Sequence, residues 1–211
     1  GDQDLDLLIT HIAPFTGDGF IRRFRNDGGV FVGEDILGTL SVEHGEVQWG
    51  DYDSDGDLDI LVAGNIRETD GSYATALRVY RNDAETFVPI EIMSCALCEG
   101  WFDLSAATWA DYDSDGDIDI LLAGTYNSGS QIEGRAKIYD NVEGSFVDSG
   151  NQLPAPRASG FSGGSFSWLD IDGEGDLGFA PAVGCVVGDV GCAGDHALII
   201  AFAERHHQCG Q

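Results

Sequence analysis

Short runs of apolar or alternating residues follow one another along the chain, separated by clusters of Gly, Asn and Asp. Residues 59–63 and 119–123 are almost wholly apolar, residues 76–80 and 136–139 alternate, and residues 86–90 form a third short run. A fourth run in each unit ends at a tryptophan. Such short β-rich runs between turn residues predict four strands per unit and no helix.

The same pattern returns at a fixed spacing. "WGDYDSDGDLDILVAG" at residues 49–64 is repeated almost letter for letter by "WADYDSDGDIDILLAG" at residues 109–124. A weaker copy, "WLDIDGEGDLGFA", begins at Trp168, and the chain opens with "DQDLDLLIT", which is similar to the end of another copy. Self-similarity at a fixed period is the signature of a repeat architecture.

The copies divide the chain into repeats and a divergent end. We place repeats at about residues 7–60, 61–120 and 121–178, within a repeat domain of residues 1–184. Residues 185–211 lack the "YRN" strand and the next acidic loop, so they are a degenerate last repeat, the start of another domain, a tail or an erroneous sequence end. Because the first residue lies in mid-repeat, we expect the chain to be a segment of a longer protein.

Negative charge is concentrated in the loops. The chain has 37 acidic and 10 basic residues and a formal net charge of −27. This balance disfavours nucleic acid and anionic membranes as partners, and no stretch reaches the roughly 18 to 20 apolar residues of a membrane span. A hydrophobic content of 43% and clear strand periodicity argue against disorder. The loop charge therefore needs a local explanation.

The acidic loops have the spacing of a calcium cage. Counted from Asp51 as position 1, carboxylates recur at positions 3, 5, 7 and 9, with glycine at position 6, where calcium loops turn sharply. The predicted ligands in the first loop are the side chains of Asp51, Asp53, Asp55 and Asp59 with the backbone carbonyl of Asp57. In the second loop they are the side chains of Asp111, Asp113, Asp115 and Asp119 with the backbone carbonyl of Asp117. Tyr52 and Ser54 are predicted to point away from the ion. Two unit charges 4 Å apart repel by about 4 kcal/mol at an effective dielectric of 20. Without a cation we expect each loop to open.

Two other interpretations of these loops are weaker. An EF-hand requires a glutamate at position 12 and a helix after the loop, whereas position 12 is Val62 or Leu122 and a strand pattern follows. A solvated acidic turn without metal remains an alternative, but two nearly identical loops at the repeat spacing are more specific than one.

Two further copies of the loop are incomplete. The third has Asp170, Asp172, Glu174 and Asp176 as candidate ligands but Gly178 at position 9, where a carboxylate is expected. Both a bound and an empty third loop are therefore compatible with the sequence. At the start of the chain, Asp2, Asp4 and Asp6 match positions 5, 7 and 9 of a loop without its first half. We expect that site to be empty or weak.

These loops and the "YRND" strands between them resemble FG-GAP/VCBS repeats, the calcium-loop blades of integrin-α-like β-propellers that are common in exported bacterial proteins. The resemblance covers roughly residues 1–180. It implies four antiparallel strands per blade, a calcium ion in a loop between two strands, and about seven blades in a ring. Three repeats and a fragment are fewer than the four to eight blades that close a propeller. The predicted fold is therefore all-β, a partial β-propeller of about three four-stranded blades.

The resemblance also directs the functional hypotheses. The first is a non-enzymatic, extracellular or cell-surface module that binds a protein or glycan, with structural calcium. The alternative is a fragment of a carbohydrate-active propeller enzyme such as a polysaccharide lyase, and a third is a purely structural array. An arc leaves sheet edges and faces uncovered, so we expect the remaining blades of a longer chain, or self-association, to cover them.

Other conspicuous residues are weighed against ordinary roles. Periodic tryptophans (Trp49, Trp109 and Trp168) favour core packing over sugar stacking, whereas Trp101 falls outside that register and is a candidate exposed contact. Five cysteines (Cys95, Cys98, Cys185, Cys192 and Cys209) favour disulfides of an exported protein over free thiols, and over metal or redox chemistry. His206 and His207 are assigned to a tail, and His11 and His44 to the surface or loops.

Overall fold

The computed structural model contains β-strands and no helix in the residues that it describes, which are 5–12, 19–38, 40–67, 71–93, 101–127, 132–153, 165–169 and 178–182. The strands are β1 (Leu7–Ile12), β2 (Gly19–Asp27), β3 (Val30–Asp35), β4 (Ser41–Gly50), β5 (Asp59–Arg67), β6 (Tyr73–Asp83), β7 (Thr86–Met93), β8 (Trp101–Ala110), β9 (Asp119–Asn127), β10 (Ile132–Val142), β11 (Ser145–Leu153), β12 (Ser165–Leu169) and β13 (Gly178–Ala182). Within these ranges, no helix could span a membrane.

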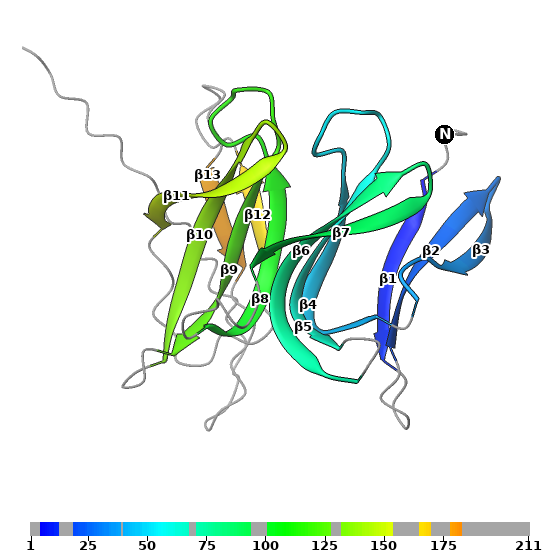
Figure 1. The fold of residues 1–211 in the computed structure, drawn as a ribbon, viewed down its shortest axis with the longest axis horizontal. Coiled ribbons are helices and arrows are strands. Elements are labelled where there is room, and N and C mark those ends of the chain that lie inside the picture. Colours follow the sequence, from blue (N-terminus) through cyan, green and yellow to red (C-terminus); the bar gives the residue numbers. More distant parts are fainter. Residues whose placement is uncertain are drawn as a thin grey trace, which may run out of the picture.

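The strands form four antiparallel sheets, each in the order of the sequence. The first sheet holds β1 to β3, the second β4 to β7, the third β8 to β11, and the fourth β12 and β13. Figure 1 shows the first three sheets standing side by side in chain order. The prediction of four strands per unit is confirmed for the second and third sheets.

The second strand of each complete sheet is buried on both faces. In β5, Ile60 and Val62 pack toward the first sheet, and Leu61 and Ala63 pack toward the third. All four side chains have no exposed surface. Successive residues of a strand point to opposite faces, so a strand between two sheets needs an unbroken apolar run. This placement explains the runs at residues 59–63 and 119–123.

The core consists of the layers between neighbouring sheets. Trp49 packs in the layer between the first and second sheets, where its ring lies 6.3 Å from that of Phe87. Trp109 packs in the layer between the second and third sheets. Core packing is thereby confirmed for these two tryptophans, while the side chain of Trp168 lies outside the described residues.

Close approach of the third sheet explains the glycine that follows Trp49. A Cβ atom built on Gly50 would lie 2.6 Å from Nε1 of Trp109. Such a contact is far inside van der Waals distance, so a side chain at residue 50 would displace the indole. The corresponding residue of the next sheet is Ala110.

The sheets divide the repeating period at a different point from the sequence repeats. Strand β8 lies within the sequence repeat 61–120, but it pairs with β9, most of which lies in the next repeat, through Trp109↔Ile120 and Ala110↔Asp119. A cyclic pattern can be cut anywhere along its period, and hydrogen bonding decides which strands share a sheet. The repeat bounds predicted above therefore describe the period and not the individual sheets.

Several sequence predictions fall outside the described residues. They concern all five cysteines, His206, His207, residues 185–211, the third acidic loop with Asp170, Asp172, Glu174 and Asp176, and the side chains of His11, His44 and Trp101. These predictions stay as they were made.

Candidate metal centre

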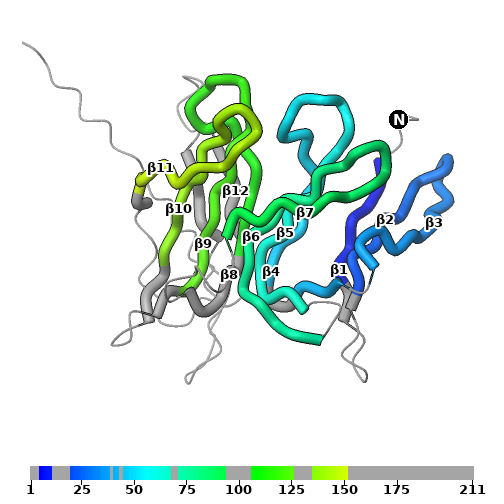
Figure 2. The backbone as a smooth tube through the Cα atoms, in the orientation of Figure 1, coloured from blue at the N-terminus to red at the C-terminus, as the bar shows by residue number. Residues whose placement is uncertain are grey.

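The two intact acidic loops each join the first two strands of a sheet. We call them loop 51–59 and loop 111–119. The register pairs Gly50 with Asp59 and Ala110 with Asp119, which fixes the base of each loop. Both loops lie at the same end of the molecule, where Figure 2 shows them as the cyan and green connections above the sheets.

The two loops have the same backbone conformation. Position 4 has a positive φ in both, 57° at Ser54 and 63° at Ser114, and so does position 6, 93° at Gly56 and 100° at Gly116. Glycine adopts such angles without the steric penalty of a Cβ atom. The N–H of Gly56 donates to Oδ2 of Asp51 at 3.1 Å, and its counterpart Gly116 makes the same bond to Asp111 at 3.1 Å.

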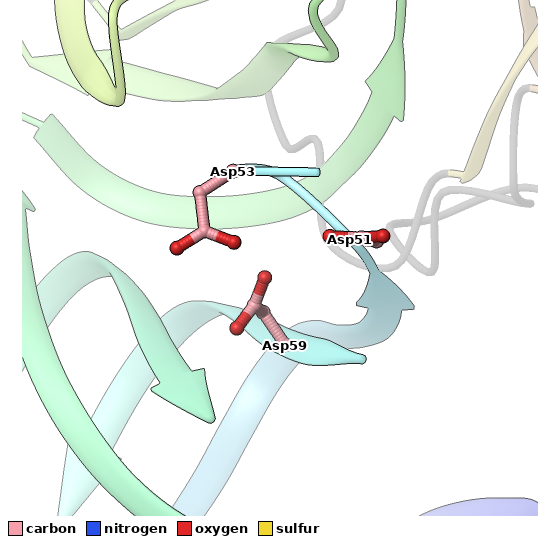
Figure 3. Close-up of side chains that lie close together, drawn as sticks. All are labelled: Asp51, Asp53 and Asp59. Atoms are coloured by element: carbon pink, nitrogen blue, oxygen red, sulfur yellow. The ribbon is translucent and has the colours of Figure 1, made fainter. Parts of the chain in front are cut away.

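Carboxylates gather inside each loop. In loop 51–59, Asp51, Asp53 and Asp59 each offer an oxygen, and these atoms all lie within 4.8 Å of one another. Figure 3 shows the carboxylates of Asp53 and Asp59 facing each other, with Asp51 beside them. Like charges at such distances repel strongly. The arrangement therefore favours a cation among these oxygens.

One carboxylate oxygen of this group is buried without a hydrogen bond. It is Oδ1 of Asp51, whereas Oδ2 of the same group accepts from Gly56. Leaving a buried polar atom unpaired costs about 1–3 kcal/mol, and more for a charged group. A hard cation such as calcium binds carboxylate oxygens, so the residues present fit a metal ion.

The aspartate at position 9 is the most deeply placed member of each loop. Asp59 is 1% exposed, and its two oxygens accept from the backbone N–H groups of Tyr52, at 3.1 Å, and Asn82, at 2.8 Å. Burial raises the pKa of Asp59 to about 6, although the hydrogen bonds from the two backbone N–H groups lower it. A nearby dication would lower this pKa, because it favours the charged form.

Asp119 has the same environment in loop 111–119. It is 2% exposed and accepts from the N–H groups of Tyr112 at 3.2 Å and Asn141 at 2.8 Å. Burial raises its pKa to about 6 as well. The aspartate at position 9 thus fastens the loop to the third strand of its own sheet.

The predicted ligands are brought together only in part. In loop 51–59 the group of three leaves out Asp55 and Asp57. In loop 111–119 the group is Asp111, Asp113 and Asp115, and it leaves out Asp117 and Asp119. Asp55 and Asp115 each accept from the N–H two residues later, at 2.8 and 3.0 Å. Which of these groups bind an ion stays a prediction.

Three asparagines that the sequence analysis did not single out organise the loops. They are Asn26, Asn82 and Asn141. Each donates its backbone N–H to the aspartate at position 9 and its Nδ2 to the carbonyl at position 8, and accepts at Oδ1 from the N–H three residues later. For Asn26 these partners are Asp6, Leu5 and Gly29, at 2.8, 3.3 and 2.7 Å. For Asn82 they are Asp59, Leu58 and Glu85, at 2.8, 3.1 and 2.7 Å. For Asn141 they are Asp119, Ile118 and Gly144, at 2.8, 3.2 and 2.9 Å.

A signal for these asparagines was present in the sequence. They stand in "FRND", "YRND" and "YDNV", at equivalent places between one acidic loop and the next. Asparagine is common in turns for local reasons, so the pattern indicated a turn and gave no hint of a loop partner. The contact of Asn26 with Asp6 places Asp6 at position 9, as predicted, while Asp2 and Asp4 lie outside the described residues.

The acidic loops and the strands around them match a known repeat family. The sequence profile of the FG-GAP-like repeat family matches residues 1–62 and 111–178, which together exceed half of the chain. The chain belongs to the FG-GAP-like repeat family. FG-GAP-like repeats form β-propellers and often bind calcium, so the sheets are blades of a partial β-propeller. No curated protein matches the chain.

Proposed function

We propose that this FG-GAP-like chain is an extracellular or cell-surface module in which calcium is structural. The observation that carries the proposal is the gathering of three carboxylates in each of two loops with one backbone conformation. The unpaired buried oxygen of Asp51 supports it, because a cation would supply the missing partner.

The chemistry of the loops favours calcium over other ions. All candidate ligands are hard oxygens, which suit calcium and magnesium rather than zinc or copper. Magnesium demands near-octahedral geometry and keeps its waters, whereas calcium accepts six to eight oxygens in flexible geometry. Extracellular modules bind calcium at about 10⁻⁴ to 10⁻³ M, which suits a compartment where the ion is plentiful.

The structural role follows from the place of the loops. When bound, the ion would supply positive charge at one end of a blade, where the acidic loop meets the third strand of its own sheet. The chain's own residues fix the loop: Asp59 and Asp119 accept hydrogen bonds from backbone N–H groups of the loop and of the third strand, and so link the two. We therefore assign the ion to the stability of the blades and not to a reaction.

The module's partners follow from its unfinished faces and its class. Leu8 packs into the first layer, while its neighbours Leu7 and Ile9 are 47% and 42% exposed on the opposite face of β1. That face supports packing by the remaining blades of a ring of about seven, or by a second copy, which the mass of the protein in solution would distinguish. The proposed ligand of the assembled module is a protein or a glycan.

Thermal unfolding with calcium and with a chelator tests the metal claim. Calcium at a hundredfold excess over Kd stabilises by about 2.7 kcal/mol per site, and 1 kcal/mol moves Tm by about 2–4 °C in a chain of this size. We expect the chelator to lower Tm by about 5 °C or more, and magnesium to restore little of the loss. An unchanged Tm contradicts structural calcium.

A charge-matched control separates the loops from general charge effects. Asp53→Ala with Asp113→Ala should reduce the calcium-dependent rise in Tm, because both loops lose a gathered carboxylate. Asp27→Asn with Asp35→Asn removes the same number of charges from the first sheet, where the two side chains pair with Arg25 and Arg22 on the surface. Surface pairs contribute at most about 1 kcal/mol, so this control should keep the full calcium effect.

A further inference from the structure

One buried asparagine links the two acidic loops. Asn141 is 3% exposed, and its Nδ2 donates to two carbonyls, that of Ile118 in its own blade at 3.2 Å and that of Tyr52 in the preceding blade at 2.8 Å. Its Oδ1 accepts from Gly144 at 2.9 Å. Both Nδ2 hydrogens and the Oδ1 atom of this side chain are therefore engaged, and one of the bonds crosses the layer between blades.

The crossing bond completes a path from one position-9 aspartate to the other. The N–H of Tyr52 donates to Asp59 at 3.1 Å, and the carbonyl of Tyr52 accepts from Asn141 at 2.8 Å. The N–H of Asn141 then donates to Asp119 at 2.8 Å. One peptide unit and one asparagine thus connect a candidate ligand of loop 51–59 with a candidate ligand of loop 111–119.

Aromatic packing holds the same junction. The ring of Tyr52 is stacked on that of Trp109, with centroids 6.5 Å apart and planes 8° apart, and lies 5.5 Å from the ring of Phe146. Trp109 stands two residues before loop 111–119 begins. Close-packed layers transmit small displacements instead of absorbing them, so a change at Tyr52 reaches the second loop.

Asn82 provides a natural comparison. It makes the same contacts as Asn141 with its own blade, to Asp59, Leu58 and Glu85. In the part of the chain that the structure describes, Asn82 makes no hydrogen bond to the preceding sheet. Asn82 is thus matched to Asn141 in every contact but the crossing bond.

We infer that calcium binding in loop 51–59 and in loop 111–119 is energetically coupled, and that Asn141 is the positioning residue that couples them. This inference rests on the proposed function. An ion in loop 51–59 fixes Asp59 and the Tyr52 peptide, whose carbonyl holds Asn141, whose N–H orients Asp119. The second ion then meets a loop that is already ordered, and its binding costs less conformational entropy. By linkage, each ion raises the affinity for the other by the same factor.

The test follows each loop separately by nuclear magnetic resonance during a calcium titration. The amide signals of Gly56 and Gly116 report the two loops. Asp53→Ala disables loop 51–59, and we expect the Gly116 midpoint to rise about fivefold or more, the lower end of typical coupling between sites. Asp113→Ala should raise the Gly56 midpoint by a similar factor. Work at 0.15 M salt limits direct repulsion between loops.

A double-mutant cycle isolates the role of Asn141. In Asn141→Ala, adding Asp53→Ala should leave the Gly116 midpoint almost unchanged, because the path is already cut. In the matched Asn82→Ala protein, adding Asp53→Ala should still raise it about fivefold or more. Any through-space effect of the lost charge would persist in both backgrounds and is thereby separated.

Each result has a definite meaning. An unchanged Gly116 midpoint in Asp53→Ala overturns coupling, and an equal rise with and without the Asn141 side chain overturns the role of Asn141. Failure of Gly56 and Gly116 to titrate with calcium in the original protein overturns the proposed function as well. If Asn141→Ala does not fold, the Asn141 side-chain amide signals in Asp113→Ala decide: they must titrate with the Gly56 midpoint, and their constancy overturns the inference.

Discussion

Loop 51–59 and loop 111–119 have almost the same residues and the same backbone angles, yet their surroundings differ. Tyr52, at position 2 of the first, is 4% exposed beneath the aromatic side chains of the third sheet. Tyr112, its counterpart, is half-buried, and burial together with the neighbouring carboxylate of Asp140 raises its pKa to about 12. The loop sequence sets the conformation of the loop, and the following blade sets its environment.

The difference extends to the crossing hydrogen bond. Asn141 of the third sheet reaches the Tyr52 carbonyl of loop 51–59. Two loops that are alike in themselves therefore need not bind an ion equally well.

The largest expected effect tests the role of the next blade directly. Tyr52→Ala should lower the free energy of unfolding by about 3 kcal/mol, because large buried aromatics cost about 3–5 kcal/mol when truncated. Tyr112→Ala should cost clearly less, since its side chain is only half-buried. Denaturant unfolding in saturating calcium measures both. Equal losses would mean that the third sheet gives Tyr52 no special support.

A second pair of variants tests the shared backbone. Gly56→Ala and Gly116→Ala force a side chain into φ angles of 93° and 100°, and each should cost about 1–2 kcal/mol because left-handed angles penalise a Cβ atom. No heavy atom lies within 4 Å of either added Cβ, so the cost is conformational. We expect equal losses by denaturant unfolding. A clear inequality would show that the loops differ in conformation as well as in surroundings.

The smallest effect concerns the residue before each loop. Gly50→Ala places a methyl group against the indole of Trp109 and should cost about 1 kcal/mol or somewhat more, as overpacking does. The reverse change, Ala110→Gly, should cost about 1 kcal/mol through chain entropy and the loss of one buried methyl group. Near-ultraviolet circular dichroism should change for Gly50→Ala only. A spectrum like that of the original protein would exclude displacement of Trp109.

The sequence was sufficient for features that depend on near neighbours in the chain. The apolar runs predicted β5 and β9, and the alternate carboxylates with glycine at position 6 predicted two acidic loops, in each of which three of the five carboxylates lie close together. Metal binding by these groups stays a prediction. These patterns extend over about ten residues, a range in which strand periodicity and turn geometry determine the local structure.

The sequence was insufficient where distant strands meet. The bond from Asn141 to Tyr52 joins residues of different blades, and a turn-forming asparagine carries no mark of such a partner. The grouping of strands was likewise hidden, because β8 could have belonged to either neighbouring unit until its pairing with β9 was known. Both features are properties of assembly and not of local pattern.

The alternation within β5 and β9 has a consequence for how such chains can change over time. Even-numbered residues such as Ile60 and Ile120 contact the preceding blade, and odd-numbered residues such as Leu61 and Leu121 lie on the opposite face. A single strand thus carries two separate sets of packing residues, one for each neighbouring sheet. Duplicating or transplanting a blade succeeds only when the even set of the newcomer fits the odd set of the blade before it.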